Sequence, residues 1–454
     1  MTEDSFQKRG KTTMKHKTLY LLCILSICVL FNGCGKDKIQ YKDTYVSGQD
    51  FQYMYSGKTY EFGLSMAETD DAYYKLLDDY IYYVDKKSMK AVPLCGKSDC
   101  MHEKESSSHR TNCNAYIRSE DGYMNLYKDN LYVRTTERDK EEQIDYSVFY
   151  AISLDGSKRN KVCEIKKDTI GFWLIHRGKL YYTVKDKNEQ VSLKAIDLKK
   201  KTSPKTVYRE KNIFNSDPEE LLAYGNNIYL YIGGFSKKLD FLSNDNDEGD
   251  DVSIKEKKQQ EQKMWQNYEN KWICYNITNQ KATELFSKQK DKDGVTRFIV
   301  QRIAFRQDKL YFMYSDLEKK KDDVICESNL DGSNEKKWKD IDVNKNAIFT
   351  IDTDYLYIYD TWSEAVEKGK KTPTMWVYDK NKKLVDTCKL PVGFCASLPP
   401  GSKQYFWYTE SGDTKDALVY MDKSKIGSLK GKMLKLDTCY DIVRPTYDEI
   451  TEEE

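Results

Sequence analysis

The sequence predicts an all-β fold, a β-propeller of seven four-stranded blades, with six or eight blades as the alternatives in number. Three observations lead to this prediction. A tyrosine motif recurs at nearly constant spacing, a strand–turn–strand pattern follows its copies, and the repeats show no helical periodicity. Repeats of about 40–50 residues with four antiparallel strands each are typical of propeller blades, which stack around a common axis.

The tyrosine motif consists of an acidic or Gly/Asn-containing turn, an apolar residue and a tyrosine, as in LYKDNLYVRT and LIHRGKLYYTV. Successive anchoring tyrosines are 50, 49, 48, 82, 46 and 48 residues apart, and the long interval corresponds to one repeat plus 34 inserted residues. Two packed sandwiches or an irregular solenoid, the competing folds, would not hold one motif at this spacing. The anchoring residues are Tyr82, Tyr132, Tyr181, Tyr229, Tyr311, Tyr357 and Tyr405.

The strand–turn–strand pattern reads FYAISLDGSKRNKVCEI in one repeat and ICESNLDGSNEKKW in another. Asp155-Gly156 and Asp331-Gly332 are expected to form two-residue hairpin turns in which both central residues have positive φ. Tyrosine and β-branched residues in the flanking segments suit a pleated sheet. Each repeat is therefore expected to supply four short strands, and the propeller to cover residues 70–440.

Composition limits the function. The chain has 454 residues, ample for a large core, with 74 Lys and Arg against 73 Asp and Glu. This balance argues against nucleic acid as a partner, because the chain has no global basic field. Aromatic residues reach 13% beside 32% charged residues, so we expect a folded body with a heavily solvated surface rather than a disordered chain.

The N-terminus has the pattern of an export signal. Five basic side chains precede an apolar run at residues 19–31, and Cys34 follows shortly after it. The run is well short of the roughly 20 residues that span a bilayer. It resembles a bacterial lipoprotein signal, in which the cysteine is acylated and becomes the first residue, and two or more acyl chains anchor the protein stably. We expect a signal peptide at 1–33 and lipid attachment at Cys34, with Met1 or Met14 as initiator; the alternative is an uncleaved anchor.

Three further regions flank or interrupt the repeats. Residues 34–69 are expected to be a tether with a candidate closing strand, and residues 441–454 an acidic tail. Residues 235–271 form an insertion in the fourth blade, with the acidic run NDNDEGDD and a short surface helix. The acidic run resembles a calcium loop, with a solvated loop as the alternative. Since long insertions commonly carry recognition, the candidate contact surface consists of Asp245, Asp247 and Trp265.

One cysteine segment is expected in the loop between the first and second blades. Cys95, Cys100, His102 and Cys113 lie within twenty residues. Three thiolates and an imidazole would satisfy a structural Zn²⁺ ion. A disulfide, either Cys100–Cys113 or Cys95–Cys113, is the rival interpretation for an exported protein, and free thiols are the third. A zinc ion or a disulfide would each cross-link and stabilise a polar loop. Nothing in the segment marks the open coordination position that a catalytic metal needs.

The units LYYTV…AIDL and LDGSN, with the segment PLCGKSDCMH…CNAY, resemble those of uncharacterised β-propeller lipoproteins of anaerobic Gram-positive bacteria. The units also resemble the repeat domain named after the receptor-related low-density-lipoprotein propeller. The resemblance covers roughly residues 70–440 and implies a propeller with a cysteine segment near the end of its first blade, here with a longer spacer before Cys113. Because the repeat motifs are structural, the resemblance implies little about activity.

The sequence contains no G-x-S-x-G motif, phosphate loop or dinucleotide fingerprint. His176 lies in the turn IHRGK and is expected to be exposed rather than catalytic. We therefore favour a non-enzymatic binding or scaffold propeller for a protein, peptide or glycan, lipid-anchored to the bilayer at the extracellular face of the cell membrane. The alternative is a polysaccharide-acting enzyme, a glycosidase or lyase with carboxylates in the propeller channel.

Overall fold

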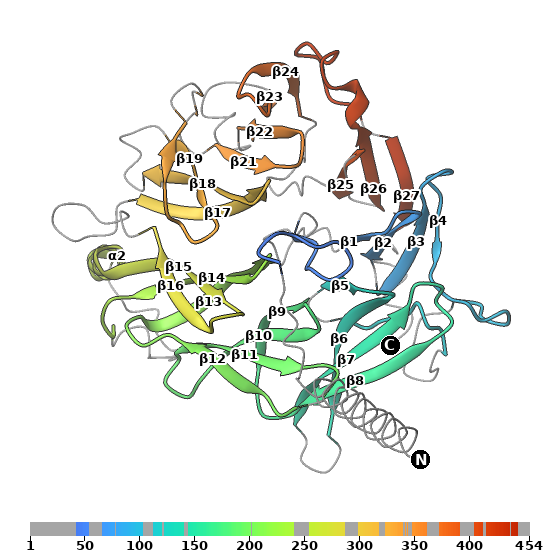
Figure 1. The fold of residues 1–454 in the computed structure, drawn as a ribbon, viewed down its shortest axis with the longest axis horizontal. Helices are drawn as coiled ribbons and strands as arrows, with labels where there is room; N and C mark the ends of the chain where they lie inside the picture. The colour runs from blue at the N-terminus through green and yellow to red at the C-terminus, as the bar shows by residue number, and fades with distance from the viewer. Residues whose placement is uncertain are drawn as a thin grey trace, which may run out of the picture. The chain divides into compact units, whose positions relative to one another are not determined.

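The computed structural model confirms the predicted fold class. The chain forms a seven-bladed β-propeller in which the sheets follow one another in chain order around a common centre (Figure 1). Six blades have four antiparallel strands, and three strands of the seventh are described. The structure describes residues 42–53 and 66–443, apart from 78, 103–111, 120–121, 140–143, 201, 240–253, 287–297, 317–322, 339–340, 342, 344–346, 361–371, 391–403, 412–414 and 436.

Neighbouring strands in the chain are neighbours in each sheet, so every blade is a simple meander. Blade 1 consists of β1 (Met66–Glu68), β2 (Ala72–Leu77), β3 (Tyr80–Asp85) and β4 (Ala91–Pro93). Blade 2 consists of β5 (Met124–Tyr127), β6 (Asn130–Arg138), β7 (Asp145–Ser153) and β8 (Arg159–Ile165). Blade 3 consists of β9 (Ile170–His176), β10 (Lys179–Lys185), β11 (Val191–Asp197) and β12 (Lys205–Arg209).

The remaining blades repeat the same meander. Blade 4 consists of β13 (Phe214–Tyr224), β14 (Asn227–Phe235), β15 (Tyr268–Asn276) and β16 (Lys281–Leu285). Blade 5 consists of β17 (Phe298–Arg306), β18 (Lys309–Asp316), β19 (Val324–Asn329) and β20 (Lys336–Lys337). Blade 6 consists of β21 (Ile348–Ile351), β22 (Tyr355–Tyr359), β23 (Thr374–Asp379) and β24 (Leu384–Lys389), and blade 7 of β25 (Tyr405–Ser411), β26 (Lys415–Asp422) and β27 (Asp437–Val443).

The recurring tyrosines mark equivalent places, as predicted, in blades 2 to 6. Each is the third residue of the second strand and is buried, because alternate side chains of a strand face the core between blades; these are Tyr132, Tyr181, Tyr229, Tyr311 and Tyr357. In blade 7 the anchoring tyrosine lies two positions earlier in its strand. Tyr405 is the first residue of β25, and the third residue is the fully buried Trp407. Blade 1 departs from the pattern: Tyr82 is the third residue of β3, the third strand of its blade, so it does not occupy the equivalent place.

The turn type expected at the Asp-Gly pairs is wrong. Only the glycines have positive φ, 67° at Gly156 and 81° at Gly332. Ser153 N–H donates to Lys158 O at 3.0 Å, so four residues rather than two form the first of these turns. The carboxylate of Asp155 accepts the backbone N–H of the residue two positions later at 3.0 Å, which holds the aspartate in an ordinary conformation and leaves the left-handed position to the glycine.

Residues 42–53, here called the axial segment, lie across the centre of the ring, where Figure 1 shows them in blue. This part of the expected tether is built into the propeller. Three residues that bond to the segment, Lys128, Arg177 and Asn226, lie in turns between the first and second strands of their blades. The segment therefore crosses the rim that these turns form. Its hydrogen-bond partners are Glu68 in blade 1, Lys128 in blade 2, His176 and Arg177 in blade 3, Asn226 in blade 4 and Phe305 in blade 5.

The ring closes by packing of blade 7 on blade 1. The rings of Tyr73 and Trp407 lie 4.9 Å apart, edge to face, and Cys439 Sγ lies 3.3 Å from Met89 O. Of the stretch FQYMYS, a candidate for a closing strand, the first three residues belong to the axial segment and the rest lie outside the described residues. Aromatic packing between faces therefore joins the described parts of the first and last blades.

The insertion of blade 4 contains the expected helix, α2 (Ile254–Asn267), which lies between β14 and β15. Antiparallel strands reverse direction at each turn, so the connection from β14 to β15 leaves from the rim opposite the axial segment. β27 ends at Val443, three residues into the stretch expected to be an acidic tail. In the described part of the chain, no helix has the length and apolar character needed to cross a membrane.

Candidate functional site

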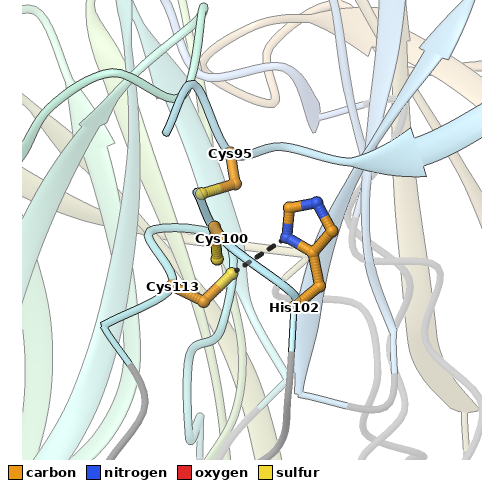
Figure 2. A group of neighbouring side chains, drawn as sticks. All are labelled: Cys95, Cys100, His102 and Cys113. Carbon is orange, nitrogen blue, oxygen red and sulfur yellow. Dashed lines mark hydrogen bonds between the residues drawn. The ribbon is translucent and has the colours of Figure 1, made fainter. Parts of the chain in front are cut away.

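The predicted cysteine segment comes together as one cluster. The ligand atoms of Cys95, Cys100, His102 and Cys113 all lie within 4.8 Å of one another, and Figure 2 shows them turned toward a common space. Cys113 Sγ and His102 Nδ1 are 3.5 Å apart. The eight cysteines of the described residues are free, so neither of the two disulfides considered for this segment is present. The cluster can hold a metal ion.

The two ends of the loop that carries the cluster are held by one residue of blade 1. Ile81 O accepts the N–H of Leu94 at 2.8 Å, and Ile81 N–H donates to Ala115 O at 2.9 Å. The N–H and C=O of a strand residue point to the same edge of the strand. The chain therefore leaves this edge of β3 at Cys95 and returns to it next to Cys113, which places both sulfur atoms on the same side of the blade.

A turn of blade 2 holds the same two ends from the outside. The carbonyl oxygen of Gly156, in the turn between β7 and β8, accepts Gly96 N–H at 3.1 Å and Asn114 Nδ2–H at 2.8 Å. These donors directly follow Cys95 and Cys113 in the chain. A Cβ at Gly156 would lie only 2.6 Å from the oxygen of Leu94, so the turn packs too closely for any other residue.

His102 and the thiols have distinct environments. Tyr80 OH donates to His102 O at 2.7 Å, and His102 itself has φ of 56°, so its ring is aimed by a strained backbone that β3 supports. Burial raises the pKa of the Cys113 thiol to about 12. At Cys95 burial also raises the pKa, but the backbone N–H groups of Lys97 and Asn114 outweigh it, and the pKa of Cys95 is lowered.

A second polar cluster fixes the axial segment and was not foreseen from the sequence. Asp50 and Arg177 form a bidentate ion pair with distances of 2.6 and 3.0 Å, and their side chains are 0% and 1% exposed. Arg177 also donates to Thr44 O at 3.0 Å and to Asn226 Oδ1. A buried ion pair is tolerated only when its remaining hydrogen-bonding groups are satisfied, as they are here. Gly225 has positive φ, and a Cβ there would overlap the backbone of the axial segment.

The expectation that His176 is exposed is wrong, because its side chain is fully buried at the end of β9. Its Nδ1 accepts the N–H of Phe51 at 3.1 Å, and its Nε2 lies 2.8 Å from Gly225 O. A backbone amide can only donate and a carbonyl can only accept, so the ring is neutral with its proton on Nε2. Burial lowers the pKa of His176 to about 4; the carboxylate of Asp50 and the bond to Gly225 oppose this effect, and Arg177 adds to it.

The other predicted site residues are not brought together by the described structure. Cys34, Asp245 and Asp247 lie outside the described residues, and Trp265 is in α2. One local signal pointed to the second cluster: His176 ends the first strand of its blade, where the corresponding positions of blades 2 and 4 carry Tyr127 and Tyr224. The pairing with Asp50 has no local signal, since 127 residues separate the partners.

Comparisons with known proteins agree with the fold. No protein-family model and no curated protein matches the chain. A solved structure of a prolyl endopeptidase is similar over 87% of this chain and 51% of its own, with 13% identity and a TM-score of 0.50. Two solved structures are more distant. Oligogalacturonate lyase is similar over 65% of this chain and 82% of its own, with 10% identity and a TM-score of 0.39. TolB of Acinetobacter baumannii is similar over 79% of this chain and 75% of its own, with 11% identity and a TM-score of 0.32. The chain spans about half the length of the peptidase, and at 13% identity the likeness to the peptidase shows the propeller fold alone.

Proposed function

We propose that this protein is a cell-surface lipoprotein of the propeller group that it resembles, anchored in the bilayer through Cys34, and that it acts as a non-enzymatic binding or scaffold propeller for a protein, peptide or glycan. The observation that carries the non-enzymatic part is the axial segment. It crosses the rim at the centre of the ring and bonds to five of the seven blades.

Three of the titratable groups at this rim hold the segment in place. Asp50 is paired with Arg177, and both side chains are almost completely buried. His176 uses both ring nitrogens in hydrogen bonds to backbone groups. General acid–base catalysis needs a group within reach of substrate, with a pKa near the working pH, and these three groups lack that access. Their arrangement supports a structural role for this end of the channel.

The path of the chain also favours one rim as the contact surface. A fully extended chain covers at most about 3.6 Å per residue, so the eight steps from Cys34 to Lys42 could reach about 29 Å. An acyl group on Cys34 would therefore keep the axial-segment rim close to the membrane. The insertion with α2 leaves from the opposite rim. This supports the stretch with Asp245, Asp247 and Trp265 as the surface that meets a ligand.

The anchor is tested by labelling cells that express the full chain with an alkyne fatty acid. Wild type should be labelled and should partition into detergent, and Cys34→Ser should lose both properties. Cys28→Ser changes another cysteine of the same segment and should behave as wild type. Equal labelling of wild type and Cys34→Ser would contradict the anchor.

The binding function is tested with the full chain in detergent, on arrays of peptides and cell-surface glycans. Replacing residues 241–253 with a Gly–Ser linker of equal length should abolish binding and leave the unfolding temperature unchanged. The same preparation is incubated with pectic and other acidic polysaccharides. Release of new chain ends by the wild type would refute the non-enzymatic proposal in favour of the polysaccharide-acting alternative.

A further inference from the structure

The cysteine cluster has the donors and nearly the dimensions of a zinc site. In a tetrahedral site with Zn–S near 2.3 Å and Zn–N near 2.0 Å, neighbouring donor atoms are about 3.5–3.8 Å apart. The separation of Cys113 Sγ and His102 Nδ1, 3.5 Å, already has this value. The remaining donor separations of the four residues are at most 4.8 Å, so movements of about 1 Å would complete the tetrahedron.

The surrounding structure brings these donors together before any ion binds. Ile81 holds the two ends of the loop at one strand edge, and the Gly156 carbonyl binds the residues that follow Cys95 and Cys113. Cys113 is buried among apolar side chains of blades 1 and 2, and Cys95 and Cys100 pack against the same group. A preformed cluster needs less ordering of the chain when it binds a ligand, which favours binding.

The chemistry of the donor set favours one class of ion. Thiolate and imidazole are the ligands of tetrahedral zinc sites, whereas calcium and magnesium take oxygen ligands. A disulfide would use two of the three sulfur atoms and would leave the third sulfur and the aimed imidazole of His102 without a role. Four protein donors also fill the tetrahedron, so no position is left for a substrate or a water molecule.

We propose that Cys95, Cys100 and Cys113, through Sγ, and His102, through Nδ1, bind one structural Zn²⁺ ion. The three thiols release their protons to solvent on binding, and the imidazole binds as a neutral ligand. Two positive charges of the ion and three negative charges of the thiolates leave the site with a net charge of −1. The ammonium group of Lys97, which donates to Asn112 O within the same loop, places a positive charge nearby.

The ion joins the two ends of the chain excursion between blades 1 and 2. With zinc bound, Cys95 and Cys113 are covalently tied through one centre, and the turn of blade 2 that rests on both ends is held with them. Chelation should therefore loosen the junction of blades 1 and 2. This inference is independent of the ligand and of the membrane anchor proposed above.

The first test is metal analysis of the full chain, purified in detergent without chelator. We expect one zinc per chain by plasma mass spectrometry, and Co²⁺ replacement should produce the strong visible bands of a tetrahedral thiolate site. Thiol titration of the native protein should find the three cluster cysteines unreactive until a strong zinc chelator is added. An intact mass two hydrogens lower, with no zinc, would overturn the proposal in favour of a disulfide.

Variants distinguish the cluster from adventitious binding. Cys100→Ser and Cys113→Ser should each lower bound zinc at least tenfold after dialysis. His102→Cys keeps four donors and should retain the metal, with the cobalt spectrum shifted toward that of a four-thiolate site. Cys163→Ser removes a half-buried thiol of β8 outside the cluster and should bind one zinc, as wild type does.

The result that overturns the proposal does not depend on folding of the variants. Full reactivity of the three thiols in wild-type protein before chelation, with less than a tenth of a zinc per chain, would show that they are free. Unchanged zinc content in Cys100→Ser would show that the ion is bound elsewhere. A Cys113→Ser protein that fails to fold is replaced in the comparison by Cys100→Ser, whose side chain is only partly buried.

Discussion

Acid should weaken the propeller through His176, and the effect can be calculated from its burial. The ring is fully buried and neutral, and burial lowers the pKa of His176 from the ordinary value of 6.5 to about 4. The charged groups that influence it, Asp50 and Arg177, act in opposite directions and are paired with each other. Between pH 4 and 6.5 His176 is protonated in the unfolded chain and neutral in the folded chain, so the free energy of unfolding rises with pH in this window.

The size follows from proton linkage. A tenfold difference in proton affinity corresponds to about 1.4 kcal/mol, so the shifted pKa contributes roughly 3 kcal/mol in full, and about 2 kcal/mol of it is lost between pH 7.5 and pH 5. The stabilisation is complete above pH 6.5 and falls as the pH approaches 4. Protonation of Nδ1 would also remove the acceptor for the N–H of Phe51 and so release the axial segment.

The assay compares wild type with His176→Gln, which can still hydrogen-bond but does not titrate. Denaturant unfolding is followed at pH 7.5, 6 and 5, and only the difference between the two proteins is interpreted, because all other groups titrate in both. At pH 7.5 the variant should be less stable by about 1–2 kcal/mol for its poorer hydrogen bonds. At pH 5 this difference should be zero or reversed by up to about 1 kcal/mol, because wild type has lost about 2 kcal/mol that the variant keeps.

Two outcomes would refute the reasoning. One is a stability difference between wild type and His176→Gln that stays constant from pH 7.5 to 5. The other is an NMR titration in which the Cε1–H resonance of His176, assigned by its loss in the variant, moves with a midpoint near 6.5. Either result would mean that the imidazole reaches solvent in the native state.

Two further predictions concern stability. Asp352→Asn should cost about 3 kcal/mol by denaturant unfolding, because it removes the carboxylate that pairs with the buried ammonium of Lys423 at 2.6 Å. Asp437→Asn, which changes an exposed ion pair, should cost under about 0.5 kcal/mol, and equal costs for the two variants would contradict this explanation. Gly156→Ala should lower the unfolding temperature more than Gly48→Ala. Both glycines have positive φ, but only a Cβ at Gly156 would meet backbone, at 2.6 Å. A larger loss of stability in Gly48→Ala would contradict the packing described for this turn.

The blades could be predicted from the sequence because each is a local structure. In blades 2 to 6 a strand, a turn and a following tyrosine recur at the first turn of each meander, and the third position of the second strand is buried. The cysteine segment could be predicted for the same reason, since its four donors lie close in the chain. Local patterns were less reliable for turn type, because Asp155 accepts a hydrogen bond from its own turn and takes an ordinary φ.

The sequence by itself determined the repeat, the number of blades and the donors of the cysteine cluster. Only the tertiary structure decided that His176 is buried, that Asp50 pairs with Arg177 across 127 residues, and that one carbonyl of blade 2 holds both ends of the cysteine loop. The physical reason is the range of the forces. Strand periodicity and turn chemistry act between near neighbours in the chain, whereas burial and ion pairing depend on which distant segments meet when the ring of blades closes.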